Sequence, residues 1–438
     1  LAPHKSTIQA REKYISSKLK TVLSSKTPAK FALGFHHFGL HQTATGWIFR
    51  EWAPNATQIF LIGDFSDWKE RKEFALNRDK NGKWSVNLPE GSLRHGQKYK
   101  LRVYWPGGDG WRLPSYANYV VQNKDSVDFS SVVWSPKTPY DWQYKTPPKP
   151  KVPLIYEVHI GMSGQEEKVA SFSEFTTEVL SRIKESSYNT IQLMAIAEHP
   201  YYGSFGYHVS NFFAVSSRFG TPDDFKKLVD TAHGMGLRVI IDLVHAHAAK
   251  NEVEGLGNFA GDPTQYFKPT NHPEWDSRLF DYGKPEVLHF LASNCRWWLD
   301  EYHIDGFRFD GITSMIYHDH GLGKSFTSYD DYFRDNVDKD ALAYLRLANE
   351  TIHDVRPDAT TIAEEMSGFP GLGASTKDGG LDFDYRLQMG APDLWIKTLK
   401  EKNDEDWDLG QLAYTLSSHR PEEKVINYAE SHDQALVG

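Results

Sequence analysis

Four short segments of this chain each place side chains that can carry acid–base chemistry at the end of a predicted strand. These segments are DLVHAH, GFRFDG, IAEE and ESHD, and they hold Asp242, His247, Arg308, Asp310, Glu364, His432 and Asp433. A single carboxylate at a strand end more often caps the following helix than reacts. Four such ends on one loop face are hard to explain as caps, so the sequence predicts one common site.

The residue types in these segments are compatible with two kinds of chemistry. Cleavage of a glycosidic bond needs two carboxyl groups, one as acid and one as nucleophile or base. A metal site is the alternative, because Asp242, His247, Asp310 and His432 are all possible ligands. Arg308 favours the first, since it shares a strand face with Asp310, where it would repel a divalent cation and keep the carboxylate ionised. We therefore expect neither a metal nor another cofactor.

The elements that must position these side chains follow Pro153, where short apolar strands alternate with amphipathic helices. The predicted strands are 154–160, 190–194, 238–244, 306–310, 360–364, 381–385 and 425–430. The predicted helices are 173–185, 222–234, 285–302 and 339–355, with further pieces over 391–417. The alternation predicts an α/β fold with parallel strands. No glycine-rich phosphate loop follows the first strand, so a (β/α)8 TIM barrel, with its site at the strand C-termini, is favoured over a nucleotide-binding open sheet.

Four regions are predicted along the 438 residues. Residues 1–27 form a helical segment that packs on the rest of the chain. Residues 28–133 change to a period of two and predict an antiparallel β-sandwich, with strands near 46–52, 57–62, 84–88, 98–103 and 119–121. Residues 134–153 form a proline-rich linker. The barrel occupies residues 154–438, and we expect it to stop after about seven strands, before the eighth.

Composition limits the classes of partner and the compartment. The net charge is −9 with scattered Lys and Arg, which argues against nucleic acids and anionic membranes as partners. No apolar run reaches the length of a membrane helix, and the N-terminus has no signal-peptide core. The one cysteine, Cys295, permits no intrachain disulfide, so a reducing compartment is predicted: the cytoplasm, or a plastid in a photosynthetic organism. The sequence does not indicate the oligomeric state.

The four segments resemble, in order, the four signature regions of the α-amylase superfamily. Longer stretches, among them GFRFDGITSMIYHDHG, TIAEEMSG and YAESHDQALVG, are similar to the glycogen and starch branching enzymes of the eukaryotic-type group. The likeness covers essentially the whole chain. In the sandwich, REWAPNA and GDFSDW resemble the N-terminal carbohydrate-binding module of that family.

This resemblance implies a division of roles among the carboxylates. Asp310 would be the nucleophile, Glu364 the general acid/base and Asp433 the third carboxylate, which orients the sugar hydroxyls. Glu364 has no arginine in its own motif, so we expect it to stay protonated while Arg308 keeps Asp310 ionised. Glu365 is the alternative acid, but strand alternation points it away from the cleft.

The resemblance also implies that Tyr207, His247, Arg308 and His432 line the cleavage subsite and that Asp242 positions Arg308. The partner would be an α-1,4-glucan such as glycogen, amylose or amylopectin, cut through a covalent intermediate and passed to a 6-hydroxyl to form an α-1,6 branch. A hydrolase of amylase type and a non-catalytic glucan-binding protein remain the alternatives.

Aromatic residues make up 14% of the chain, which fits either large β-rich cores or sugar binding. In the sandwich, Trp52 and Trp68 are the candidates to stack on glucan. The competing interpretation is that both belong to the core.

Overall fold

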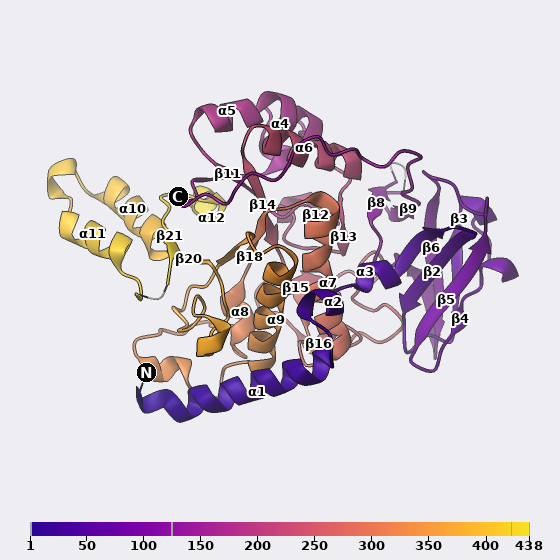
Figure 1. Cartoon of the computed structure of the whole chain (residues 1–438), viewed down its shortest axis with the longest axis horizontal. Coiled ribbons are helices and arrows are strands. Elements are labelled where there is room, and N and C mark those ends of the chain that lie inside the picture. Colours follow the sequence, from indigo (N-terminus) through magenta and orange to yellow (C-terminus); the bar gives the residue numbers. More distant parts are fainter. Residues whose placement is uncertain (1, 124–125, 422, 438) are drawn as a thin grey trace. The chain divides into compact units, whose positions relative to one another are not determined.

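The computed structural model describes residues 2–123, 126–421 and 423–437. The chain forms two compact units. Figure 1 labels the helices and strands of the chain. The terminal unit comprises Leu1–Pro28 and Gly306–Gly438, and the central unit comprises Ala29–Asp305. Among the described helices, none is both long and apolar enough to cross a bilayer.

The central unit begins at Ala29, within the short helix α2 (Pro28–Phe31), and continues with the short helix α3 (Gly34–His37) and the predicted sandwich. One antiparallel sheet has the order β1-β2-β5-β4, with β1 at Gly39–Thr43, β2 at Gly46–Trp52, β4 at Asn77–Arg78 and β5 at Lys83–Pro89. The other contains β3 (Gln58–Gly63), β6 (Lys98–Trp105), β7 (Gly108–Arg112), β8 (Tyr119–Gln122) and β9 (Phe129–Val132). The core of the sandwich includes the fully buried residues Phe49 from the first sheet and Leu61, Leu101 and Val103 from the second. The predicted strands are confirmed.

The second sandwich sheet also takes strands from beyond the proline-rich segment, which sequence patterns did not predict. β13 (Asn211–Ser216) pairs in parallel with β8, and β12 (Ala197–Glu198) pairs with β13. Farther along the chain, β15 (His247–Ala249), β16 (Phe267–Asn271) and β17 (Ser277–Phe280) form a small antiparallel sheet. Backbone hydrogen bonds therefore join the sandwich to the segment that follows it, within one unit.

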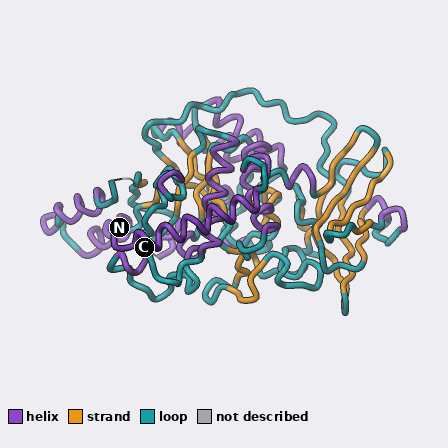
Figure 2. The backbone as a smooth tube through the Cα atoms, turned by 60° about the horizontal axis from the view of Figure 1, so that its bottom comes forward, coloured by secondary structure: helices purple, strands orange, loops and turns teal. Residues whose placement is uncertain are grey.

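The rest of the central unit is the first part of the predicted barrel. β10 (Ile155–Val158), β11 (Thr190–Leu193) and β14 (Arg238–Leu243) pair in parallel in that order. Figure 2 shows the change from the strand-rich sandwich to this alternation of strands and helices. α6 (Pro222–Gly234) and α7 (Pro285–Tyr302) have the predicted bounds. The predicted helix at 173–185 is two helices, α4 (Phe172–Glu178) and α5 (Leu180–Glu185).

Local capping explains where α6 begins. The Thr221 hydroxyl accepts from the Asp224 N–H, and the Asp224 carboxylate accepts from the Thr221 N–H and hydroxyl. Pro222 occupies the first turn, where no N–H partner is needed. This reciprocal capping satisfies helix-end donors that would otherwise lack partners.

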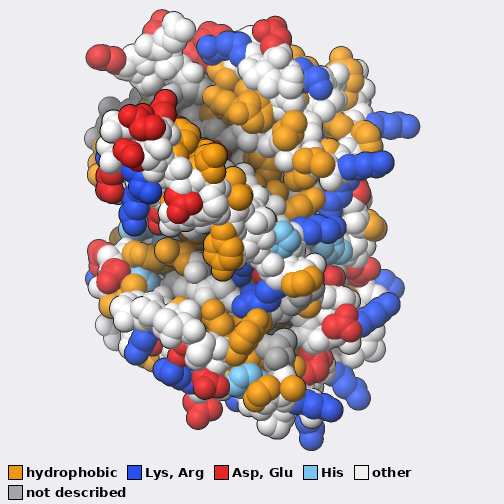
Figure 3. All heavy atoms as spheres, turned by 90° about the vertical axis from the view of Figure 1, so that its left-hand side faces the viewer, with side chains coloured by type: hydrophobic (Ala, Val, Ile, Leu, Met, Phe, Trp, Pro, Cys, Tyr) orange, Lys and Arg blue, Asp and Glu red, His pale blue; other side chains and the backbone are white. Residues whose placement is uncertain are grey.

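The terminal unit holds four further parallel strands: β18 (Gly306–Phe309), β19 (Thr360–Ala363), β20 (Tyr385–Leu387) and β21 (Val425–Ile426). Its helices include α8 (Ile312–Ile316), α9 (Lys339–Val355), α10 (Gly390–Glu401), α11 (Leu409–Ser417) and α12 (His432–Val437). The face seen in Figure 3 mixes charged and hydrophobic side chains. Among the exposed large hydrophobic residues, Leu409 and Tyr414 belong to α11. Parallel strands alternating with helices in both units confirm the predicted barrel class.

Helix α1 (Lys5–Leu23) is the packing helix that its apolar spacing predicts. It contacts α9 and buries Ile15 and Leu19. Arg346 of α9 donates two hydrogen bonds to the carboxylate of Glu12, of 2.9 and 2.6 Å. Such a forked pair fixes how α1 lies on α9.

Two predicted strands are wrong in their bounds. Over 381–385, the backbone N–H groups of Leu381 and Phe383 bond to the carbonyls of Gly371 and Leu372, so their apolar alternation reflects loop packing. The ladder starts only at Tyr385. The predicted strand at 425–430 ends at Ile426, and Asp433 lies in α12 instead of directly at a strand end.

Candidate active site

Arg308 is the centre of the charged cluster in the terminal unit. It lies on β18 with 2% of its surface exposed. Its Nη1 donates to Asp310 Oδ1 at 3.0 Å, and its Nη2 lies 2.8 Å from Glu364 Oε1. One guanidinium therefore binds both carboxylates that the sequence assigned to bond cleavage. Such charge-assisted contacts are about twice as strong as neutral hydrogen bonds.

The strands bring these groups together because β18 and β19 pair closely. Gly306 has a φ of +156°, and a Cβ there would lie 2.0 Å from the carbonyl oxygen of Thr360, so only glycine fits. The register places Arg308 opposite Ile362, two residues before Glu364. At the end of β18, Gly311 in the left-handed region donates its N–H to Glu364 Oε2 at 2.8 Å. The Glu364 carboxylate is thus held from two sides.

Although the motif that contains Glu364 has no arginine, the Glu364 carboxylate does have an arginine partner. The partner is Arg308, which stands on the neighbouring strand and reaches Glu364 with the second arm of its fork. A motif read along one strand cannot show a contact made across the ladder. Arg308 therefore orients both carboxylates instead of Asp310 alone.

Glu365 faces away from this cluster, as strand alternation predicts. Its buried carboxylate accepts from the backbone N–H groups of Ser367 (2.7 Å), Gly368 (2.9 Å) and Phe369 (2.9 Å). The Ser367 and Thr313 hydroxyls donate to it as well. A buried carboxylate that accepts from this many donors fixes the loop after Glu364.

The third predicted carboxylate, Asp433, lies in α12 with 51% of its side chain exposed. His432 Nε2 is 3.4 Å from its Oδ1. The closeness of Asp433 and His432 to Asp310 and Glu364 stays a prediction.

In the central unit, Tyr207 and Asp242 form a direct pair. The Tyr207 hydroxyl donates to Asp242 Oδ2 at 2.6 Å, and Asp242 is buried near the end of β14. That Asp242 also positions Arg308 stays a prediction.

His247 begins β15 and is buried between aromatic neighbours. The ring of His208 stands edge-on at 5.7 Å between centroids, and that of Trp275 is tilted at 5.1 Å. Burial, with the nearby His208 and His272, lowers the pKa of His247 to about 3. A neutral imidazole of this kind can bind a sugar hydroxyl without adding charge.

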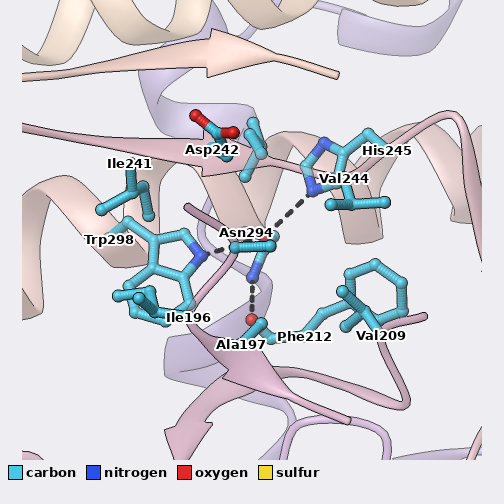
Figure 4. A pocket seen from close by; sticks show the side chains of 12 residues that line it. Ile196, Ala197, Val209, Phe212, Ile241, Asp242, Val244, His245, Asn294 and Trp298 are labelled. Atoms are coloured by element: carbon cyan, nitrogen blue, oxygen red, sulfur yellow. Dashed lines mark hydrogen bonds between the residues drawn. The ribbon is translucent and has the colours of Figure 1, made fainter. Parts of the chain in front are cut away.

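His245, two residues earlier, is a core residue. Its Nε2 bonds to Asn294 Oδ1 at 2.9 Å, and Asn294 Nδ2 donates to the Phe212 carbonyl at 2.7 Å (Figure 4). The Asp242 carboxylate points away from Asn294 in this view. The enclosed cavity here measures only about 10 Å³, which is room for about one water. It is too small for a sugar.

The two module tryptophans differ in setting. Trp52 packs edge-on against Tyr266, with centroids 5.3 Å apart, and its carbonyl accepts from Gln265 at 2.8 Å. It thus joins the sandwich to the segment after β15. That Trp52 also binds glucan stays a prediction.

Trp68 presents its ring to solvent, with 38% of its surface exposed. Its φ of 59°, next to Asp67 at 52°, is unusual for residues other than glycine. Its Nε1 donates to Asp64 at 2.9 Å, which holds the indole in place.

Beside Trp68 stands Trp111, 37% exposed, with ring centroids 6.4 Å apart. Both rings border a cleft of about 340 Å³, which is also lined by Lys100, Asn123 and Asp128. Sequence reasoning missed Trp111, because it predicted no strand over Gly108–Arg112 and so did not place this tryptophan on the sheet.

Among the described residues, no group of three or more His, Cys, Asp and Glu side chains is arranged to hold a metal ion.

Comparisons with known proteins agree with this arrangement. The family model of carbohydrate-binding module 48 (isoamylase N-terminal domain) matches residues 37–117, and that of the alpha amylase catalytic domain matches residues 176–268. The 1,4-alpha-glucan-branching enzyme of Dictyostelium discoideum is 47% identical over 448 residues, which is 100% of this chain and 66% of that protein. The chain belongs to the 1,4-alpha-glucan-branching enzyme family of the α-amylase superfamily.

A second relative, the branching enzyme of Felis catus, is 49% identical over 420 residues, covering 93% of this chain and 60% of that enzyme. The chain thus spans about two thirds or less of the length of these branching enzymes. Among solved structures, a putative alpha amylase from Salmonella typhimurium matches with a TM-score of 0.66 at 20% identity, over 91% of this chain and 66% of that one. That likeness shows a shared fold alone.

Proposed function

We propose that this branching-enzyme chain cleaves α-1,4-glucan and transfers the released segment to a 6-hydroxyl, forming an α-1,6 branch. The observation that carries the proposal is the Arg308 fork, which holds Asp310 and Glu364 together. Two carboxyl groups at one bond are what a retaining glycosyl transfer requires. The family relationship supports the choice of α-glucan as the substrate.

In the first step, Asp310 attacks the anomeric carbon while Glu364 gives a proton to the departing glycosidic oxygen. The C–O bond breaks, and the sugar is held as an ester on Asp310. In the second step, Glu364 takes the proton of an acceptor 6-hydroxyl, whose oxygen displaces Asp310. Arg308 stabilises the charge of Asp310 whenever that carboxylate is free.

The remaining predicted site residues take supporting roles in this proposal. Asp433 orients the hydroxyls of the reacting sugar. Tyr207, His247 and His432 bind the same sugar, and the Tyr207–Asp242 pair keeps the phenol ring in place.

Residues 28–133 would act as the carbohydrate-binding module, followed by the linker at 134–153 and the barrel. The paired rings of Trp68 and Trp111 support glucan binding on the module, because a fixed aromatic face stacks on the apolar face of a pyranose. The scattered charge supports a neutral polymer, not nucleic acid or membrane, as partner, and a cytoplasmic location fits the single buried cysteine.

Incubation with amylose tests the proposal. Iodine absorbance should fall, isoamylase should release new short chains, and reducing ends should not accumulate. Reducing ends that accumulate without new α-1,6 linkages would instead identify a hydrolase, in which water resolves the same ester. Asp310→Asn should abolish turnover while glucan binding persists, and an active Asp310→Asn variant would contradict the nucleophile assignment.

A further inference from the structure

A large cleft lies in the central unit, apart from Tyr207, Asp242, His247 and the Trp68 cleft. Its volume is about 760 Å³, within the range of about 300–1,000 Å³ that is typical of ligand sites. It is bordered by α3, β1, the start of β2, the proline-rich segment, α6 and the end of α7. All of these belong to one unit, so the cleft is formed without the terminal unit.

Half-buried aromatic rings form part of its wall. Trp134, Tyr140 and Trp297 each show part of their surface to solvent. Trp134 is held edge-on between His95 and Tyr119, at 4.9 and 5.0 Å. The Trp297 indole donates to the Phe213 carbonyl at 2.9 Å. Rings fixed in this way lose little freedom when a ligand stacks on them.

Polar side chains with spare hydrogen-bonding capacity lie at the rim of the cleft. Exposed Gln42 accepts from Ser135 at 2.8 Å and keeps its amide N–H groups available. Exposed Asp300 also borders the cleft. A sugar hydroxyl can accept from such an amide N–H and donate to such a carboxylate, since it does both.

The charges in the wall favour a neutral ligand. The cleft has three acidic residues (Asp223, Asp300 and Glu301) and two lysines (Lys137 and Lys226), a net charge of −1 with neutral histidines. Lys226 bonds to Glu301, and Asp300 accepts from Arg296 at 2.8 Å. A phosphate or an acidic peptide would find little uncompensated positive charge here.

We propose that this cleft binds a stretch of α-glucan chain as an accessory site. Fixed aromatic faces, interleaved amide and carboxylate groups and a small net charge match a neutral chain of pyranose rings. The inference rests on the proposed function for the choice of glucan. Such a site would let the enzyme bind its polymer at a place other than the bond that is cut.

Site-directed labelling tests the cleft directly. The native Cys295 is buried, so thiols introduced at the exposed rim by Gln42→Cys or Asp300→Cys would be the reactive ones. A bulky maleimide should modify both. Maltoheptaose at about nine times its dissociation constant should slow that labelling about tenfold, since only the unoccupied fraction reacts.

The matched control is Lys227→Cys, an exposed position on α6 that does not border the cleft. Its labelling rate should not change with maltoheptaose. Cellohexaose, whose rings are β-linked, should protect none of the three. Once labelled, the Gln42→Cys enzyme should be retained less on immobilised glycogen, whereas the labelled Lys227→Cys enzyme should be retained as the wild type is.

The outcomes separate this inference from the proposed function. If amylose is branched but maltoheptaose protects neither Gln42→Cys nor Asp300→Cys, the cleft is not a glucan site and the inference is overturned. Equal protection by cellohexaose would overturn the assignment to α-glucan. If the chain fails to branch amylose and maltoheptaose still protects both rim positions, the accessory site stands and the catalytic proposal fails.

Discussion

Replacement of Arg308 tests how the two carboxylates are held. Arg308→Lys keeps the positive charge, but a single ammonium replaces the two arms that bind Asp310 at 3.0 Å and Glu364 at 2.8 Å. Loss of one hydrogen bond to a charged group costs about 1.5–3 kcal/mol. When that cost falls on the transition state, kcat/KM drops by about 10- to 160-fold. Arg308→Gln removes the positive charge as well as both contacts, so we expect kcat/KM to fall by about 10³-fold or more.

The assay is kcat/KM for amylose branching, measured alongside the free energy of unfolding by denaturant titration. The matched control is Arg346→Lys, because buried Arg346 also binds a carboxylate with two arms, that of Glu12. Arg346→Lys should lower stability by a similar amount and leave kcat/KM near the wild-type value. A kcat/KM for Arg308→Lys within threefold of wild type would refute the reasoning, because the fork would then not matter to the reaction.

Three further predictions concern the module, the loop after Glu364 and acid stability. Trp68→Ala and Trp111→Ala should each weaken glycogen binding about fivefold, because each ring contributes about 1 kcal/mol of stacking. Catalysis on short maltooligosaccharides should not change. Affinity electrophoresis in glycogen gels measures the binding. Glu365→Gln should lower the free energy of unfolding by about 2–4 kcal/mol, because buried N–H donors lose their acceptor; an unchanged denaturation midpoint would contradict the loop role. Burial lowers the pKa of His245 to about 4 and that of His247 to about 3. Below about pH 6.5 both histidines are protonated in the unfolded chain but stay neutral in the folded chain. Each histidine should therefore lower the free energy of unfolding by about 2 kcal/mol at pH 5. Denaturant titrations at pH 7 and pH 5 should show this loss, and His245→Asn should reduce it.

The order of elements was readable from the sequence because local patterns set it. The helices Pro222–Gly234, Pro285–Tyr302 and Lys339–Val355 have the predicted bounds, since caps and apolar spacing act within a few residues. The weak strands were misplaced. At Leu381, the same alternation serves a loop, because which carbonyls receive the N–H groups depends on the distant segment around Gly371.

The site shows the same division. The sequence by itself determined which carboxylates, arginine and histidines the four segments hold, and the resemblance to a known family assigned their roles. Only the tertiary structure decided that Arg308 reaches Glu364 as well as Asp310, that Trp111 stands beside Trp68, and that β13 joins the sandwich sheet. Each of these contacts joins residues that are apart in the sequence. Because a side chain's partner is set by strand register and packing, not by its neighbours in the chain, no local pattern contains that information.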